Sequence, residues 1–401
     1  MFKNMGMSNG DLALYTSLLY LPWVIKPLWS PFVDIIRTKR WWIVTMQAIM
    51  ALSFALIALS LPGKETLSAG KVTVGPFILS LIVFYVSALA SATHDIAADG
   101  FYMIALDSHS QSVFVGIRST FYRIASVFGQ GVLVVIAGIL ETRTGNVSLA
   151  WSITLVFCSV ILGALSLWHL KSLPRTEGTY TLKRSGSEIM SDLGRTFITF
   201  FKKPNVLFAM VFMLLYRLPE AFSVKMLNPF LLDATSEGGL GLSTEAVGLA
   251  YGTIGVIALT VGGILGGLAA AKWGLKKVIW PMALSLALPC SVYLYMALAQ
   301  PESIIAITGC IALDQFGYGF GFTAYMLYMM YFSEGEYKTS HYALCTAFMA
   351  LSMMLPGLVA GHLQESLGYV GFFWMVMACC LATVLVTLFA KVDPSYGKSK
   401  K

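Results

Sequence analysis

The sequence contains little charge: only 12% of its 401 residues are Asp, Glu, Lys or Arg, whereas 57% are hydrophobic. A soluble domain typically has about 25% charged and roughly 45–50% apolar residues. The mean hydropathy is +0.75, and the apolar residues are gathered in blocks rather than spread evenly. This composition excludes a soluble globular enzyme and a disordered or collagen-like chain.

The sequence also lacks the usual signatures of catalysis and cofactor binding. None of its six cysteines has the spacing of a zinc site or a CxxC redox pair. The glycines after Asp314 have no strand–turn–helix context and are not a dinucleotide fingerprint. We therefore expect no enzymatic activity, no cofactor and no metal. An integral-membrane acyltransferase with His94 and Asp95 at its centre, or a receptor that binds a ligand without moving it, remain the alternatives.

Eleven apolar stretches are present that are long enough to cross a bilayer as helices, which takes about 20 residues each. They do not alternate in polarity as the short strands of an outer-membrane barrel do. We therefore predict an all-α, multi-span membrane protein. The stretches are 12–33, 41–61, 76–98, 113–139, 149–170, 205–232, 245–271, 277–298, 303–332, 341–363 and 370–390.

The distribution of the 27 Lys and Arg residues predicts the orientation of the chain. Most of them fall in alternate loops, the largest group being in 171–203, and such loops are favoured on the cytoplasmic side. This places the C-terminus in the cytoplasm, and the odd number of spans places residue 1 outside. The net charge of +7 therefore follows from topology, and we expect no nucleic-acid partner.

The longest linker, 171–203, divides the chain into two halves. Residues 1–170 hold five spans, residues 204–391 hold six, and residues 392–401 form a cytoplasmic tail. After Ser187, apolar residues recur in the linker at helical spacing. We expect an amphipathic helix that lies on the membrane surface and tethers the two halves. Its apolar residues are Ile189, Met190, Leu193, Phe197, Phe200 and Phe201.

Two turns, each directly after the first long span of its half, resemble each other. One occupies 30–40 and contains Asp34; the other occupies 267–277 and has Ala271 at the corresponding position. Both resemble the Gly-x-x-x-Asp-Arg-x-Gly-Arg-Arg turn of major facilitator transporters, which recurs once per half. The first copy lacks both glycines and the second lacks the acidic residue, so each is degenerate.

The resemblance to major facilitators implies twelve spans, two of them before the first such turn, whereas only one precedes it here. Residues 1–10 look like the external loop between the first two spans. We therefore expect that the first helix is missing from this chain, with its start placed at an internal Met. A natural architecture of eleven spans is the alternative.

Four further blocks narrow the resemblance. They are Leu-Pro-Trp-Val-Ile-Lys-Pro-Leu-Trp-Ser-Pro at 21–31, His-Asp-Ile-Ala-Ala-Asp-Gly at 94–100, Arg-Leu-Pro-Glu-Ala-Phe at 217–222 and Asn-Pro-Phe-Leu-Leu at 228–232. Together they resemble the AmpG-type muropeptide permeases, a major facilitator branch that also includes acetyl-coenzyme A transporter-like proteins. The resemblance runs from Asp11 through nearly the whole chain.

This resemblance implies a bundle of two pseudo-symmetric halves around a central cavity. It also implies proton-driven import of anhydro-muropeptides, which are fragments of recycled cell wall, across the inner membrane. We expect a monomer that takes a small-molecule substrate within the lipid bilayer. Another anionic solute, such as an acyl-coenzyme A, a peptide or an amino sugar, remains open as the substrate.

Ionisable residues inside the spans of the first half are candidates for function, because a charge at mid-bilayer costs about 2.5–3.5 kcal/mol. We predict that Lys26 and Arg123 bind a substrate anion. Asp95 and Asp99 share a helix face and are assigned, with Arg118, to a gating ion pair. Asp34 of the first turn joins this gating group. A structural salt-bridge cluster is the alternative for the two aspartates.

The second half contributes three further candidates to the translocation path. Arg217 and Glu220 can pair with each other, and Pro219 between them is typical of the broken helices on which transporters place their sites. Asp314 has no basic residue in its own span, and a low-dielectric site favours the protonated form of a carboxyl group. We predict that Asp314 and Glu220 carry protons and that Gln315 contacts the substrate. The alternative for Asp314 is a neutral side chain that only hydrogen-bonds a neighbouring helix.

Overall fold

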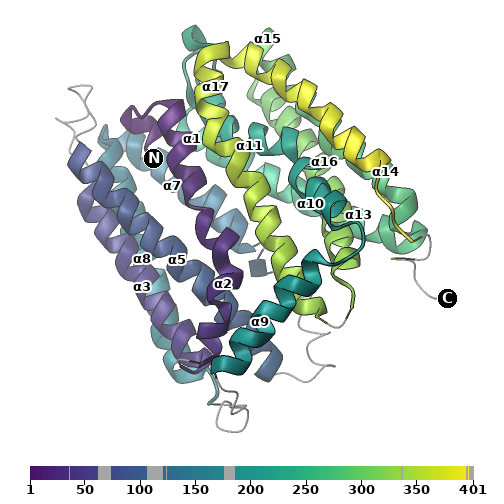
Figure 1. Ribbon diagram of the computed structural model, residues 1–401. Helices are drawn as coiled ribbons and strands as arrows, with labels where there is room; N and C mark the ends of the chain where they lie inside the picture. Colours follow the sequence, from purple (N-terminus) through teal and green to yellow (C-terminus); the bar gives the residue numbers. More distant parts are fainter. Residues whose placement is uncertain are drawn as a thin grey trace. The chain divides into compact units, whose positions relative to one another are not determined.

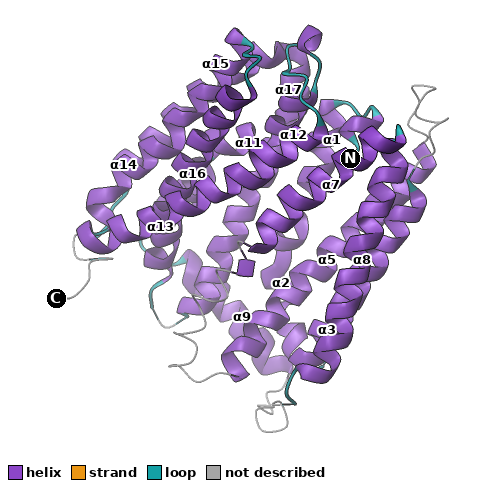
Figure 2. Ribbon diagram, turned by 180° about the vertical axis from the view of Figure 1, so that it is seen from behind, coloured by secondary structure: helices purple, strands orange, loops and turns teal. Residues whose placement is uncertain are grey.

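A computed structural model of the chain describes most of its residues. Where these residues form regular structure they are helical, and no strand occurs among them (Figures 1 and 2). The described residues are 1–35, 37–61, 74–105, 121–122, 124–175, 186–335, 337–393 and 396.

The first predicted span, 12–33, consists of two helices rather than one: α1 (Asn9–Leu18) and α2 (Leu21–Ile35). Pro22 is the second residue of α2. A proline lacks the N–H of an interior helical bond and disfavours the helical conformation of the residue before it. The chain therefore begins a new helix there, with Trp23 N–H donating to the carbonyl of Tyr20 at 3.0 Å.

The other helices before residue 186 follow the predicted spans. Thr38 caps α3 (Lys39–Ser60) by accepting from the N–H of Trp41 at 3.2 Å, and Asn146 caps α8 (Val147–Ser172) by accepting from the N–H of Leu149 at 3.1 Å. The elements are η1 (Lys3–Met5), α3 (Lys39–Ser60), α5 (Val74–Ala105), the π-helix η2 (Phe128–Val132), α7 (Leu133–Thr144) and α8 (Val147–Ser172).

Helix α9 (Gly186–Phe201) lies in the predicted linker 171–203. Its side chains differ sharply in burial: Phe200 is fully buried, whereas Ile198 and Phe201 are exposed. It packs against α2.

The remaining helices follow in order from residue 206. They are α10 (Val206–Leu215), α11 (Leu218–Leu232), η4 (Thr235–Glu237), α12 (Thr244–Val247), the π-helix η5 (Gly248–Gly255), α13 (Val256–Trp273), α14 (Leu275–Ala287), η6 (Leu288–Cys290), α15 (Ser291–Ala299), α16 (Ile304–Ser333) and α17 (Lys338–Leu388).

Nine helices among the described residues are long and apolar enough to cross a membrane. The last of them, α17, is two helices joined at Gly368, whose φ of 67° is non-helical, and it covers the predicted spans 341–363 and 370–390. The broken pair α1 and α2 supplies one more. The prediction of an all-α membrane protein is thus confirmed, and the helices are consistent with eleven spans. Exposed side chains such as Leu59 and Ile305, each 82% accessible, suit a surface that faces lipid.

The contacts divide the chain into two compact units. In unit 1, α3 packs along both α5 and α8. In unit 2, a buried core that includes Phe230, Tyr293, Ile311 and Phe373 joins α11, α15, α16 and α17. Unit 1 comprises Met1–Met7, Leu19–Tyr122 and Leu140–Phe201, and unit 2 comprises Ser8–Leu18, Arg123–Ile139 and Lys202–Lys401.

Candidate functional site

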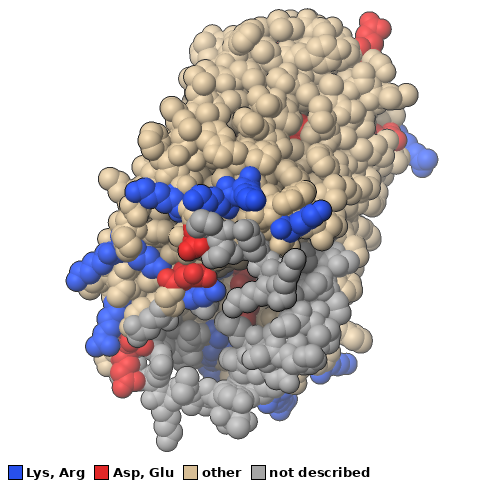
Figure 3. Space-filling model, turned by 90° about the vertical axis from the view of Figure 1, so that its right-hand side faces the viewer, with Lys and Arg blue, Asp and Glu red and all other residues tan. Residues whose placement is uncertain are grey.

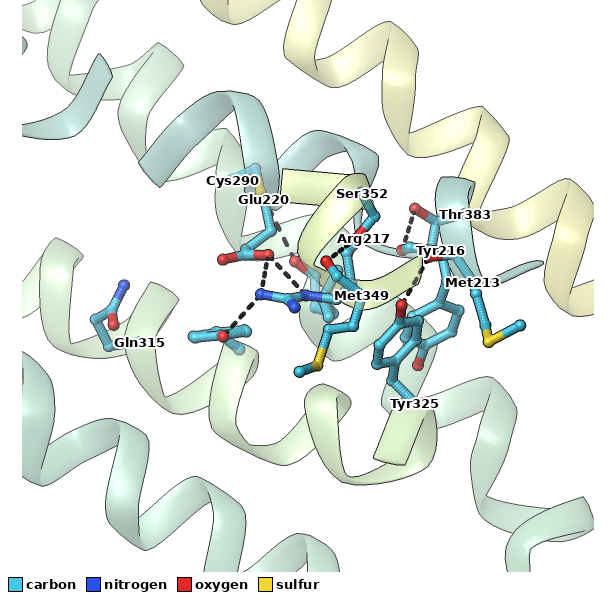
Figure 4. A network of polar contacts seen from close by, with 12 residues as sticks. Met213, Tyr216, Arg217, Glu220, Cys290, Gln315, Tyr325, Met349, Ser352 and Thr383 are labelled. Atoms are coloured by element: carbon cyan, nitrogen blue, oxygen red, sulfur yellow. Dashed lines mark hydrogen bonds and ion pairs between the residues drawn. The ribbon is translucent and has the colours of Figure 1, made fainter. Parts of the chain in front are cut away.

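The most deeply buried ion pair among the described residues lies where the predicted span 205–232 is interrupted. Helix α10 ends at Leu215, and Arg217, with φ −102° and ψ 10°, stands outside helical geometry before α11 begins. Arg217 Nη2 and Nε each lie 3.0 Å from Glu220 Oε2 (Figure 4). Both side chains are only 5% exposed. The break predicted from Pro219 is therefore present, and it places a charged pair inside the protein.

Arg217 is also enclosed by aromatic side chains of α16. Tyr318 Oη accepts a hydrogen bond from Arg217 Nη2 at 2.9 Å. The guanidinium carbon lies 4.6 Å from the ring centre of Phe322 and 5.6 Å from that of Tyr325. Attraction between a cation and an aromatic face is stronger where water is excluded. The guanidinium is therefore held by a carboxylate, a phenol and aromatic rings together.

Asp314 forms a second polar centre in unit 2, between α15 and α16. Its side chain is buried, and its Oδ2 accepts from Tyr293 Oη at 2.5 Å and from Gln315 Nε2 at 3.1 Å. No salt bridge to Asp314 occurs within the described residues. The carboxyl group therefore has neutral donors around it, an arrangement that suits a group able to exist with or without a proton. The bond to Tyr293 also joins neighbouring helices, as the structural alternative requires.

In unit 1, the structure pairs Lys26 of α2 with Asp95 of α5. Lys26 Nζ lies 2.5 Å from Asp95 Oδ2, and the side chains are 19% and 42% exposed. Asp99 lies one turn further along α5 and is half-buried. The sequence-based prediction assigned Lys26 to a substrate anion and Asp95 to a gating ion pair with Arg118, and it did not pair Lys26 with Asp95.

Three predicted site residues cannot be placed from their side chains. Arg118 and Arg123 lie outside the described residues. Asp34 lies in α2, but the position of its side chain is outside the description. Within the described part of the chain, no group of three or more His, Cys, Asp or Glu side chains could hold a metal ion.

Sequence reasoning missed the partners of the two buried acids. Tyr293, Tyr318, Phe322 and Tyr325 were not among the predicted site residues. The spacing of the last three, at i, i+4 and i+7, places them on one helix face, and this signal is present in the sequence. The sequence does not indicate, however, that this helix face contacts Arg217, which lies about a hundred positions earlier.

Comparison with proteins of known sequence gives several relatives that are named as transporters or permeases. A putative transporter AmpG 4 of Rickettsia conorii is 25% identical over 95% of this chain and 89% of its own length. The anhydromuropeptide permease of Escherichia coli is 20% identical over 98% of this chain and 76% of its own length. No family model matches the chain.

Solved structures of transporters share the arrangement of helices. A D-xylose–proton symporter superimposes with a TM-score of 0.71 at 14% identity, over 98% of this chain and 90% of that one. The nucleoside transporter NupG gives 0.67 at 16% identity, over 97% of this chain and 91% of that one. Together with the apolar helices, the sequence relatives show a multi-pass membrane transporter rather than an enzyme. It has the major facilitator fold, and its resemblance to the AmpG-type transporters is confirmed.

Proposed function

We propose that this transporter imports anhydromuropeptides across the inner membrane together with protons. The main support for the proposal is the buried Arg217–Glu220 ion pair, called the sealed pair below because both side chains are 5% exposed. Its guanidinium could bind a substrate carboxylate, but in this structure it binds Glu220. The name of the Escherichia coli relative supports this choice of substrate. An anhydromuropeptide bears carboxylates, and sugar rings that aromatic side chains can stack against.

Exchange of partners at Arg217 couples the two solutes. While Glu220 is ionised, it holds Arg217, and the desolvation cost of separating a buried pair is large. Protonation of Glu220 removes its charge and frees the guanidinium, whose planar fork fits a carboxylate in two hydrogen bonds. The substrate carboxylate therefore binds Arg217 only when Glu220 is protonated, and it is displaced when Glu220 loses its proton. Tyr318, which accepts from the same guanidinium, keeps Arg217 oriented during the exchange.

Asp314 provides a second place for a proton. Protonated, it has a hydroxyl group to donate; ionised, it keeps the bonds from Tyr293 and Gln315. In this proposal Asp314 and Glu220 carry the coupled proton, and Gln315 positions Asp314 and lies along the translocation path.

In this proposal, charged residues of the first half, 1–170, also bind and release anions. Lys26 exchanges Asp95 for a substrate anion, with Arg123 as a second cationic contact. Asp95 then belongs, with Asp34, Asp99 and Arg118, to the ion pairs that open and close the path. Because the Lys26–Asp95 pair is partly exposed, separating it costs much less than separating Arg217 from Glu220.

The proposed orientation follows the positive-inside rule. The Lys- and Arg-rich loops, with the linker 171–203 and the tail 392–401, lie in the cytoplasm, and the transporter acts as a monomer. The halves 1–170 and 204–391 rock about a site near the bilayer midplane.

The test is uptake of labelled anhydromuropeptide into vesicles that contain the purified protein, with and without an inward proton gradient. The proposal requires accumulation that depends on the gradient and ends when an uncoupler is added. Accumulation of a coenzyme A thioester, a free peptide or an amino sugar, with none of the muropeptide, would keep the transporter and replace the substrate. Equal uptake with and without the gradient would refute proton coupling.

A further inference from the structure

A cavity of about 380 Å³ lies at one end of unit 2, apart from the buried charges. Its lining comes from three places in the chain: the start of α14, the end of α16 and the segment after α17. The lining residues are Lys276, Tyr331, Ala390, Lys391, Val392 and Asp393. None of them takes part in the translocation path proposed above.

The positions of the span ends place this cavity at the membrane surface. The span of α13 ends at Trp273, that of α14 begins at Leu275, and that of α16 ends at Ser333. Trp273 is 48% exposed, and exposed tryptophans are enriched at the level of lipid headgroups. The cavity therefore opens at the depth at which headgroup phosphates lie.

Two lysines and one aspartate line the cavity, so the charge of its lining is positive overall. Lys276 and Lys391 are exposed, and neither forms a salt bridge within the described residues. Lys277 and Lys272 stand next to this rim, with Lys272 Nζ 5.1 Å from the ring centre of Trp273. Figure 3 shows basic side chains gathered on the side of the molecule where α13 and α14 lie. Anionic ligands are attracted to such a cluster.

The rest of the lining is held in place by the segment that follows α17. The N–H of Leu275 donates to the carbonyl of Tyr396 at 3.1 Å, and the rings of Tyr331 and Tyr396 meet edge to face with centres 4.9 Å apart. These contacts place Tyr396 beside the turn between α13 and α14. The cavity is therefore a formed feature of unit 2.

We propose that this cavity binds the headgroup of an anionic phospholipid, with Lys276 and Lys391 on its phosphate and Tyr331 as a hydroxyl donor. A lipid is favoured over a free phosphate because part of the lining is apolar, from Ala390 and Val392. Leu388 and Phe389, just before the cavity in sequence, are 57% and 66% exposed and continue toward the lipid phase. Acyl chains can run along them while the phosphate sits on the lysines.

The test measures lipid retention by the full chain purified in detergent, offered equal amounts of phosphatidylglycerol and phosphatidylcholine, with native mass spectrometry as the readout. The wild-type protein is expected to retain phosphatidylglycerol in preference. In the double variant Lys276→Gln/Lys391→Gln, the ratio of retained phosphatidylglycerol to phosphatidylcholine is expected to fall about fivefold for each lysine removed. This is the contribution of one lysine near an anionic surface. Lys391→Arg, which keeps the charge, is expected to retain it.

A matched control removes the same charge elsewhere. Lys171→Gln/Lys338→Gln changes two exposed lysines that do not line the cavity, and we expect it to retain phosphatidylglycerol as the wild type does. An equal loss in both double variants would mean that only overall charge matters, and this would overturn the proposal.

Two measurements on the wild-type protein alone also test the anionic-lipid site, whether or not the variants fold. Retention of both lipids in equal amounts would refute an anionic site. Displacement of phosphatidylglycerol by excess inorganic phosphate, at an ionic strength matched with chloride, would mean that the cavity takes free phosphate and would overturn the lipid assignment. Retention that survives the phosphate supports it.

Discussion

Two ion pairs of similar chemistry differ greatly in their surroundings. Arg217 and Glu220 are three residues apart at a helix break and are each 5% exposed, whereas Lys26 and Asp95 belong to different helices and are 19% and 42% exposed. A pair enclosed by protein is costly to separate, and a partly hydrated pair is not. The sealed pair is therefore suited to a step that needs a proton, and the open pair to one that needs only a change of partner.

The largest effect expected from this difference is that of Glu220→Gln. It leaves the Arg217 guanidinium buried without its counter-charge, which costs about 3–5 kcal/mol of stability. It should also abolish accumulation driven by a proton gradient, because an amide cannot take up and release the coupled proton. Thermal unfolding in detergent and vesicle uptake measure the two effects. The paired change Arg217→Met/Glu220→Leu is the control: it should recover most of the stability, because apolar pairs replace buried ion pairs at little cost, but recover no uptake. A Glu220→Gln protein that is as stable as the wild type and accumulates substrate as the wild type does would contradict the proposed role of Glu220.

The next largest effect is expected from Asp314→Asn, which should remove proton coupling while leaving folding nearly unchanged. An amide oxygen still accepts the bonds from Tyr293 and Gln315, so stability should change by about 1 kcal/mol or less. Accumulation driven by a proton gradient should be lost, while exchange of labelled for unlabelled substrate across the membrane continues. Both are measured in the same vesicles. If the variant accumulates substrate as the wild type does, Asp314 has only the structural role of joining α15 and α16.

A smaller effect is expected at the open pair. A double-mutant cycle with Lys26→Gln and Asp95→Asn should give a coupling energy of about 0.2–1 kcal/mol in unfolding experiments, the range for exposed pairs. Lys26→Gln should also raise the substrate concentration needed for half-maximal uptake, since the lysine is proposed to contact substrate. A coupling energy as large as that of the sealed pair would remove the distinction between the two.

The smallest effect concerns salt. Added salt screens exposed charges and leaves buried ones nearly untouched. The coupling energy of Lys26 with Asp95 should therefore fall as ionic strength rises, and that of Arg217 with Glu220 should stay constant. Repeating both cycles at low and high salt measures this. If the two pairs respond alike, their difference in exposure has no energetic meaning.

Much of the fold was predictable because a bilayer imposes length and composition on each helix. Even the division of α17 at Gly368 follows from the gap between the stretches 341–363 and 370–390. The break between α1 and α2 was missed, although Pro22 marks it, because the apolar run continues through it. Composition alone does not distinguish a straight span from a broken one.

The candidate site was predictable only in its charged members. Arg217 and Asp314 were identifiable because a charged side chain inside a span is costly, and such residues are therefore candidates for a functional site. Their neutral partners were not, because a tyrosine in a span is ordinary and its contacts are tertiary. Tyr293 reaches Asp314 across 21 positions and Tyr318 reaches Arg217 across 101. The same limit applies to Lys26 and Asp95, whose pairing across 69 positions was not predicted.

The most direct test of partner exchange at Arg217 is proton movement driven by substrate alone. Anhydromuropeptide is added to vesicles with no imposed gradient, and the external pH is recorded for the wild type and for Arg217→Met/Glu220→Leu. We expect the medium to become more alkaline as substrate and protons enter with the wild-type protein, and its pH to stay constant with the paired variant. Substrate entry into wild-type vesicles without any change of pH would contradict partner exchange at Arg217.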